Sequence, residues 1–173
     1  MRSALLLFLS LFGSLHCGGS RVEPASLEPG TESCRYCRMH ISELRFAGQL
    51  RAPGEEPMFF DDIGCLQAFL SDNRAARENH VAFVTDHRTQ EWVLARSALY
   101  TRSSVATPMG SGLIAHANAR SRTDDPAAIG RSALSATQIF HVTAPPGGAA
   151  DRSGQEVPMI EESSDPRRKP GKI

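Results

Sequence analysis

The chain has 173 residues, of which 40% are hydrophobic and 22% are charged, a composition typical of one modest globular domain with flanking tails. Lys and Arg total 19, as do Asp and Glu, so the formal net charge is zero. This balance gives no indication of a nucleic-acid groove or a polybasic membrane-binding surface, so we expect no nucleic-acid partner.

The N-terminal segment is typical of an export signal. Arg2 precedes an apolar run over 4–15 that is too short to span a bilayer, so we assign 1–16 to a signal peptide. Cys17 closes this run before Gly-Gly-Ser, which favours lipidation of Cys17 and a stable membrane anchor. The alternative is ordinary cleavage nearby, which would leave Cys17 outside the mature chain.

Two segments flank the predicted folded body. Residues 17–32 and 144–173 are rich in Gly, Pro, Ser and charged side chains. Such segments bury too little apolar surface to offset the conformational entropy of ordering. We therefore predict a flexible N-terminal linker and a disordered C-terminal tail.

The body contains the same order of elements twice, which predicts an α+β fold of two tandem strand–strand–helix–strand units, 33–90 and 91–143. In the first unit we expect strands at 46–51, 57–61 and 81–84 and an amphipathic helix at 64–77. In the second unit we expect strands at 91–100, 112–117 and 138–142 and a helix at 126–134, with Asp124 or Asp125 as its N-cap and Pro126 in its first turn. Because each unit alone is near the size at which a core becomes marginal, we expect the two to pack together or to depend on a ligand.

The main chemical motif is CRYCRMH at residues 34–40, which holds two thiols, a thioether and an imidazole. Cys65 and Met109 supply two further sulfur atoms. Soft sulfur ligands select copper(I) and, less sharply, zinc. Met39 beside Cys37 fits copper(I) better, because copper(I) needs only two or three soft ligands and accepts methionine. The pattern therefore favours a copper(I)-binding protein.

Three other interpretations of the cysteines remain open. One is a structural zinc ion held by Cys34, Cys37, Cys65 and one histidine. A second is a Cys34–Cys37 or Cys34–Cys65 disulfide with one buried thiol, although three cysteines do not suit a closed disulfide framework. The third is a thiol–disulfide oxidoreductase using Cys34 and Cys37, but this pair follows a linker and lacks the βαβ context of such enzymes.

The segment FFDDIGC contributes two carboxylates and a thiol. Asp61 and Asp62 precede the predicted helix 64–77, where we expect them to cap free backbone N–H groups. Cys65 would then lie in the first helical turn, where we expect its thiol pKa to fall. Whether Cys65 faces a metal site or the core stays open at this point.

The loop TPMGSG places Met109 between a proline and a glycine, which favours an exposed thioether that can act as a ligand, although a turn with an incidental methionine is the alternative. The remaining histidines stand alone in the sequence, and a lone histidine is usually solvated or hydrogen-bonded. They are His80, His87, His116 and His141.

Four blocks together resemble the NosL family of copper-binding accessory lipoproteins associated with nitrous oxide reductase maturation. In chain order they are CRYCRMHIS, FFDDIGCLQAFL, FVTDHRTQEWVLARSALY and TPMGSGLIAHA, and they span residues 34–117. The resemblance implies a fold of two small strand–strand–helix–strand units related to part of the organomercurial lyase fold. It also implies a periplasmic copper(I) chaperone that catalyses no reaction and is anchored at the outer membrane. This chaperone would deliver copper to a periplasmic copper enzyme or its assembly machinery.

The resemblance also implies a ligand set. The family's CxYCxM motif falls on Cys34, Tyr36, Cys37 and Met39, its DDIGC on Asp61, Asp62 and Cys65, and its TPM on residues 107–109. The leading copper ligands are Cys37, Met39 and Met109, followed by Cys34 and Cys65, with His40 as the best nitrogen donor. No residue is expected to be catalytic.

Overall fold

The structure is a computed structural model that describes residues 21–140. The predicted signal peptide 1–16, the lipidation site Cys17 and the predicted tail 144–173 lie outside the described residues, as does His141. Among the helices of residues 21–140, none has the length and apolar character needed to cross a membrane.

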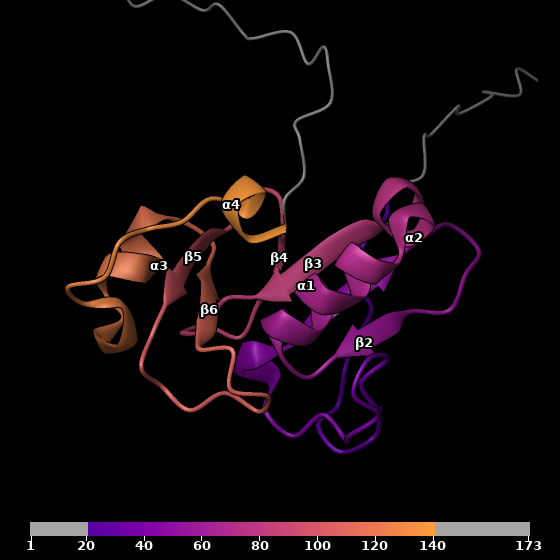
Figure 1. Ribbon diagram of the computed structural model, residues 1–173, viewed down its shortest axis with the longest axis horizontal. Coiled ribbons are helices and arrows are strands. Elements are labelled where there is room, and N and C mark those ends of the chain that lie inside the picture. The colour runs from indigo at the N-terminus through magenta and orange to yellow at the C-terminus, as the bar shows by residue number, and fades with distance from the viewer. Residues whose placement is uncertain (1–20, 141–173) are drawn as a thin grey trace, which may run out of the picture. The chain divides into compact units, whose positions relative to one another are not determined.

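The first unit is built on an antiparallel sheet with the strand order β2-β1-β3-β4. Its elements are β1 (Gly48–Arg51), β2 (Met58–Phe60), α1 (Ile63–Asp72), α2 (Arg74–Asn79), β3 (Val81–Thr85) and β4 (Trp92–Leu94). Figure 1 shows α1 lying across one face of this sheet. The predicted order of strand, strand, helix and strand is therefore present in the first unit.

Helix α1 packs closely on the sheet at Gly48. A Cβ atom added to Gly48 would lie 2.9 Å from the Leu66 side chain, so a larger residue would push the helix away. Gly48 pairs with Phe60 on one side and with Val84 on the other. The central strand β1 thus holds both of its neighbours and the helix in register.

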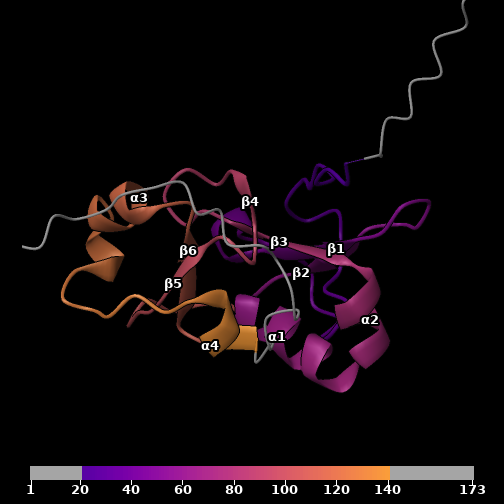
Figure 2. The ribbon, with the colours of Figure 1, turned by 90° about the horizontal axis from the view of Figure 1, so that it is seen from above.

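The second unit has a smaller, two-stranded antiparallel sheet. Its elements are β5 (Leu99–Arg102), β6 (Leu113–His116), α3 (Ala119–Thr123), the 3-10 helix η2 (Pro126–Ala128) and α4 (Ala136–Phe140). Figure 2 shows α3 and the β5–β6 pair at the opposite end of the described region from α2. A parallel bridge between Asp86 and Ala115 joins β6 to the end of β3.

The closing strand of the second unit is reduced to one residue. Leu134 forms an isolated antiparallel bridge with Tyr100 of β5, in which each N–H donates to the other residue's carbonyl at 2.8 Å. Since β3 lies beside β1 in the first unit, Leu134 takes the equivalent place beside β5. The second unit therefore repeats the topology with a vestigial last strand.

Four of the predicted elements differ from the structure. The helix predicted at 64–77 is broken at Asn73 into α1 and α2, because the Asn73 side chain and backbone N–H both bind the Phe69 carbonyl and end α1. The strand predicted at 91–100 is split into β4 and β5, in different sheets, by a turn in which Ala98 donates to the Leu94 carbonyl. β4 thereby joins the first unit's sheet, beyond the boundary predicted at residue 90.

The C-terminal half of the second unit differs from the predicted helix and strand. The helix predicted at 126–134 is only the turn η2, although Asp125 does cap it through Ala127 and Pro126 does begin it. Gly130 follows with a φ of 70°, which ends the turn. Residues 138–140 of the strand predicted at 138–142 belong instead to α4, whose first turn is held by the Ser135 hydroxyl accepting from the Gln138 N–H.

The two units share one hydrophobic core, as predicted. Buried residues from both units form it, including Leu66 of α1, Tyr100 of β5 and Ile139 of α4. The described part of the predicted linker also packs on the first unit: Leu27 is buried, and the Ala25 N–H donates to the Gln49 side chain at 2.8 Å. The predicted flexible linker is therefore wrong for this part of the segment.

Candidate metal centre

The segment 34–40 folds into a tight loop fixed by its own backbone. The Cys34 N–H donates to the Met39 carbonyl at 2.8 Å, and the Arg38 N–H donates to the Cys34 carbonyl at 3.0 Å. Arg38 has a φ of 68°, in the left-handed region. The Arg35 N–H donates to the Phe59 carbonyl at 2.8 Å, which fixes the loop to β2.

Backbone N–H groups near the cysteine sulfurs act on their pKa values. The N–H groups of Cys37 and Asp61 lower the pKa of Cys34, and the N–H of Met39 acts in the same direction on Cys37. Hydrogen bonds to the charged form of a group favour that form. The loop thus favours the thiolate, which is the metal-binding form of cysteine, and the net effect is clear at Cys34.

Three thiols and one carboxylate meet at this loop. One ligand atom from each of Cys34, Cys37, Asp61 and Cys65 lies within 4.8 Å of all the others. The Cys37 thiol donates to Asp61 Oδ1 at 3.4 Å, whereas Asp61 Oδ2 is buried and has no hydrogen-bond partner within residues 21–140. Cys34, Asp61 and Cys65 are buried, and Cys37 is partly exposed. Cys37 is therefore the member of the group nearest to solvent.

The three thiols have different proton affinities. A hydrogen bond from Cys65 lowers the pKa of Cys34 to about 6, against the opposing effect of burial. Burial raises the pKa of Cys37 to about 11. The pKa of Cys65 is raised, first because its thiol donates to Cys34 and then because it is buried. Cys65 does lie in the first turn of α1, but the prediction that its pKa falls there is wrong, because the Cys65 thiol keeps its proton in the hydrogen bond that it donates to Cys34.

All three described cysteines are free thiols. The structure therefore does not contain the alternative Cys34–Cys37 or Cys34–Cys65 disulfide. Cys65 faces both the core and the thiol group, which answers the question that the sequence left open.

The two adjacent aspartates have separate roles. Asp62 is the N-cap of α1 and accepts from the Gly64 N–H at 2.6 Å, as predicted. Asp61 makes no such cap and faces Cys37 instead. Asp62 has an extended backbone just before the helix, with φ of −144° and ψ of 139°, as an N-cap requires. The position directly before α1 was the signal that could have separated the cap Asp62 from Asp61.

Asp62 also brings the loop of Met109 to the start of α1. Its Oδ2 accepts from the Thr107 hydroxyl at 2.7 Å and from the Met109 N–H at 3.0 Å. The approach is close, because a Cβ atom on Gly64 would lie 2.6 Å from Ser111 Cβ. A single buried carboxylate thereby ties the second unit's loop to the helix that carries Cys65.

The remaining predicted ligands are exposed side chains. Met39 is 53% exposed and Met109 is 46% exposed, so both thioethers reach solvent, as predicted for Met109. Tyr36 is also exposed. His40 is exposed and belongs to neither group of close metal-ligating side chains within residues 21–140.

The chain is similar to a protein family and to a solved structure. The NosL family model matches residues 24–125. A crystal structure described as the copper chaperone NosL from Shewanella denitrificans is 21% identical, with a TM-score of 0.49, over 56% of this chain and 81% of that chain. No curated protein matches the chain.

Proposed function

The chain belongs to the NosL family, and from that premise we propose that it is an exported copper(I) chaperone. The observation that carries the proposal is the meeting of three free thiols and one carboxylate within 4.8 Å, beside a loop with an exposed methionine. Family membership confirms the prediction that the chain is not an enzyme.

The ligand chemistry supports copper as the cargo. Cys34 and Cys37 lie on a loop whose N–H groups favour thiolates, and Cys65 adds a third sulfur from α1. Copper(I) is satisfied by two or three soft ligands, so it can use part of this set together with a thioether. Met39 and Met109 are the thioethers within the proposed site, and both are accessible to an incoming protein.

The proposal extends to where the copper goes and where the protein acts. The recipient is a periplasmic copper enzyme, nitrous oxide reductase or its assembly machinery. Lipidation of Cys17 would hold the chaperone at the outer membrane, on the periplasmic side. Both parts rest on the family resemblance and on the export signal read from the sequence.

An anaerobic copper(I) titration against a chromogenic chelator tests the copper site. We expect one tightly bound copper(I) per chain, with the affinity lowered at least about tenfold by Met39→Ala and by Met109→Ala, because each removes a soft ligand. Met58→Ala is the matched control, since Met58 lies in β2 and is packed against the core. Failure of the wild-type protein to hold copper(I) against a moderate chelator would overturn the proposal.

Structural zinc is the second candidate, and one observation favours it. The fourth member of the cysteine group is the Asp61 carboxylate, and zinc accepts carboxylate oxygen beside thiolates in a tetrahedral site. Zinc present after purification that copper(I) fails to displace would support this candidate. Copper(I) binding that neither methionine variant weakens would restrict the site to the cysteines.

A further inference from the structure

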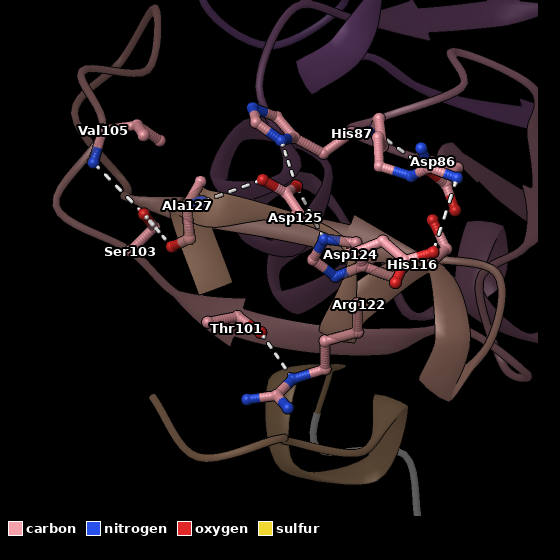
Figure 3. A network of polar contacts seen from close by, with 12 residues as sticks. Asp86, His87, Thr101, Ser103, Val105, His116, Arg122, Asp124, Asp125 and Ala127 are labelled. Atoms are coloured by element: carbon pink, nitrogen blue, oxygen red, sulfur yellow. Dashed lines mark hydrogen bonds and ion pairs between the residues drawn. The ribbon is translucent and has the colours of Figure 1, made fainter. Parts of the chain in front are cut away.

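A second group of metal-ligating side chains lies where the second unit meets the end of β3. His87 follows β3, His116 is the last residue of β6, and Asp125 precedes η2. One ligand atom from each lies within 4.8 Å of the other two. Figure 3 shows the Asp125 carboxylate between the two imidazole rings.

Both imidazoles are directed at the same carboxylate oxygen. His87 Nδ1 lies 2.6 Å and His116 Nε2 lies 2.9 Å from Asp125 Oδ2. The other oxygen, Oδ1, accepts from the Ala127 N–H at 2.9 Å, which fixes the carboxylate. Two imidazole nitrogens therefore converge on one carboxylate oxygen.

The group is enclosed. The side chains of His116, Asp125 and His87 are 0%, 5% and 11% exposed. The Phe46 ring lies 5.4 Å from the His87 ring, and Phe46 of the first unit forms a small apolar cluster with Ile114 and Ala128 of the second. Although burial by itself raises the pKa of Asp125, hydrogen bonds from His116 and His87 lower it overall, so the carboxylate is held ionised.

The tautomer of His116 is not fixed by a second hydrogen bond. Its Nδ1 is buried and has no partner among the described residues. Metal-binding histidines need a free lone pair on the coordinating nitrogen. A cation at Nε2 therefore requires the His116 proton to lie on Nδ1, where an ordered water is the acceptor that a buried N–H needs.

We propose that His87, His116 and Asp125 form a second metal site, for a divalent cation of the zinc(II) type. Three protein ligands of the kind His, His and carboxylate, with a fourth position for water, are a known zinc arrangement. Bonds of about 2.0–2.1 Å in tetrahedral geometry separate ligand atoms by about 3.4 Å, so the observed distances need to open by less than about 1 Å. Copper(I) is disfavoured because the group has no sulfur, and the site does not depend on the proposed copper function.

Zinc titration of the full chain, followed by calorimetry, tests this site against matched variants. His87→Gln and Asp125→Asn should each bind one zinc fewer than the wild-type protein. Asp125→Asn retains the Oδ1 acceptor for Ala127, so the turn η2 is kept. His80→Gln is the control, because His80 pairs with exposed Glu55 and lies in neither group; it should match the wild type.

Two further measurements keep the result decisive if a variant does not fold. Cobalt(II), used as a probe for zinc, should give visible bands without sulfur charge transfer at this site, in addition to any thiolate-bound cobalt. In the wild-type protein, zinc should shift the nuclear magnetic resonance signals of His87 Nδ1 and His116 Nε2 but not those of His80. Equal zinc stoichiometry in the wild type and both folded variants, or unshifted His87 and His116 signals, would overturn the proposal.

Discussion

In the first unit β1 is hydrogen-bonded on both sides by full strands, whereas in the second unit β5 has the strand β6 on one side and only the single bridge of Leu134 on the other. In both units, nevertheless, the N-cap of a helix lies two residues after the end of the second strand. Asp62 caps α1 after β2, and Asn118 caps α3 after β6. The two units therefore keep the same topology, although the last strand of the second unit is only the bridge at Leu134.

The two units also differ in the chemistry at equivalent places. Phe60 ends β2 and is a core residue, whereas His116 ends β6 and faces Asp125. Asp61, the next residue in the first unit, faces the thiols. The shared topology thus determines where side chains converge, and residue identity determines whether they offer sulfur, nitrogen or only packing.

The largest expected effect concerns the first unit's core. Phe60→Ala should lower the free energy of unfolding by about 3–5 kcal/mol, because it leaves a cavity where a fully buried ring packs under α1. Urea denaturation measures this. The control Ile129→Ala, at a residue 71% exposed in the second unit, should change stability by less than about 0.5 kcal/mol. Equal costs for the two changes would contradict the assignment of the core.

The next effect concerns the link between the units. Asp62→Asn should cost about 1–3 kcal/mol of unfolding free energy, because an amide NH2 cannot accept from Thr107 and Met109. Asn118→Asp is the matched control at the other helix, where the N-cap oxygen is retained, and it should be nearly neutral. Denaturation of both variants compares the two caps directly. A neutral Asp62→Asn would show that the link is dispensable.

The thiols give a pH-dependent prediction. Thiolate absorbance of the metal-free protein should rise with a midpoint near 6, since the pKa of Cys34 is lowered to about 6. Cys65→Ala should move this midpoint up toward the ordinary thiol value of 9.0 by removing the donor, whereas Cys65→Ser keeps a donor and should move it less. An unchanged midpoint in Cys65→Ala would exclude Cys65 as the cause.

The sign of the stability effect follows from the same pKa. The folded-state pKa of Cys34 is below its unfolded value of 9.0. Its contribution is therefore fully present above pH 9 and is lost as the pH falls through 6. The raised pKa of Cys65 acts in the opposite direction, with a contribution present below 9.0 and lost at higher pH.

The smallest effect should come from the vestigial strand. Leu134→Pro removes the N–H that donates to the Tyr100 carbonyl and should cost about 0.5–1.5 kcal/mol beyond the cost of Leu134→Ala. Leu134→Ala is the control, because it shortens the side chain and keeps the N–H. Urea denaturation of the two variants isolates the hydrogen bond. A difference as large as the cost of Phe60→Ala would show that the bridge is a full structural strand.

The contrast between the units also explains which features of the fold and of the candidate site can be predicted from local sequence patterns. Cys34 and Cys37 are close in sequence, so the local pattern was enough to bring them together, whereas it left open whether Cys65, in the first turn of α1, faces the metal site or the core. The end of the second unit was harder, because a strand of one residue at Leu134 has no periodicity to recognise. His87, His116 and Asp125 converge where the bridge between Asp86 and Ala115 joins the chain after β3 to β6, which no local spacing reveals.

Asp62 holds the Met109 loop by the backbone N–H and leaves the thioether unrestrained. A methionine side chain has three rotatable bonds, so its sulfur can swing away while the loop stays in place. In the proposed copper site this favours associative ligand exchange, in which a donor from the recipient replaces the thioether before the thiolates let go. The residence time of the cargo would then be set by the arriving partner rather than by any unfolding of the carrier.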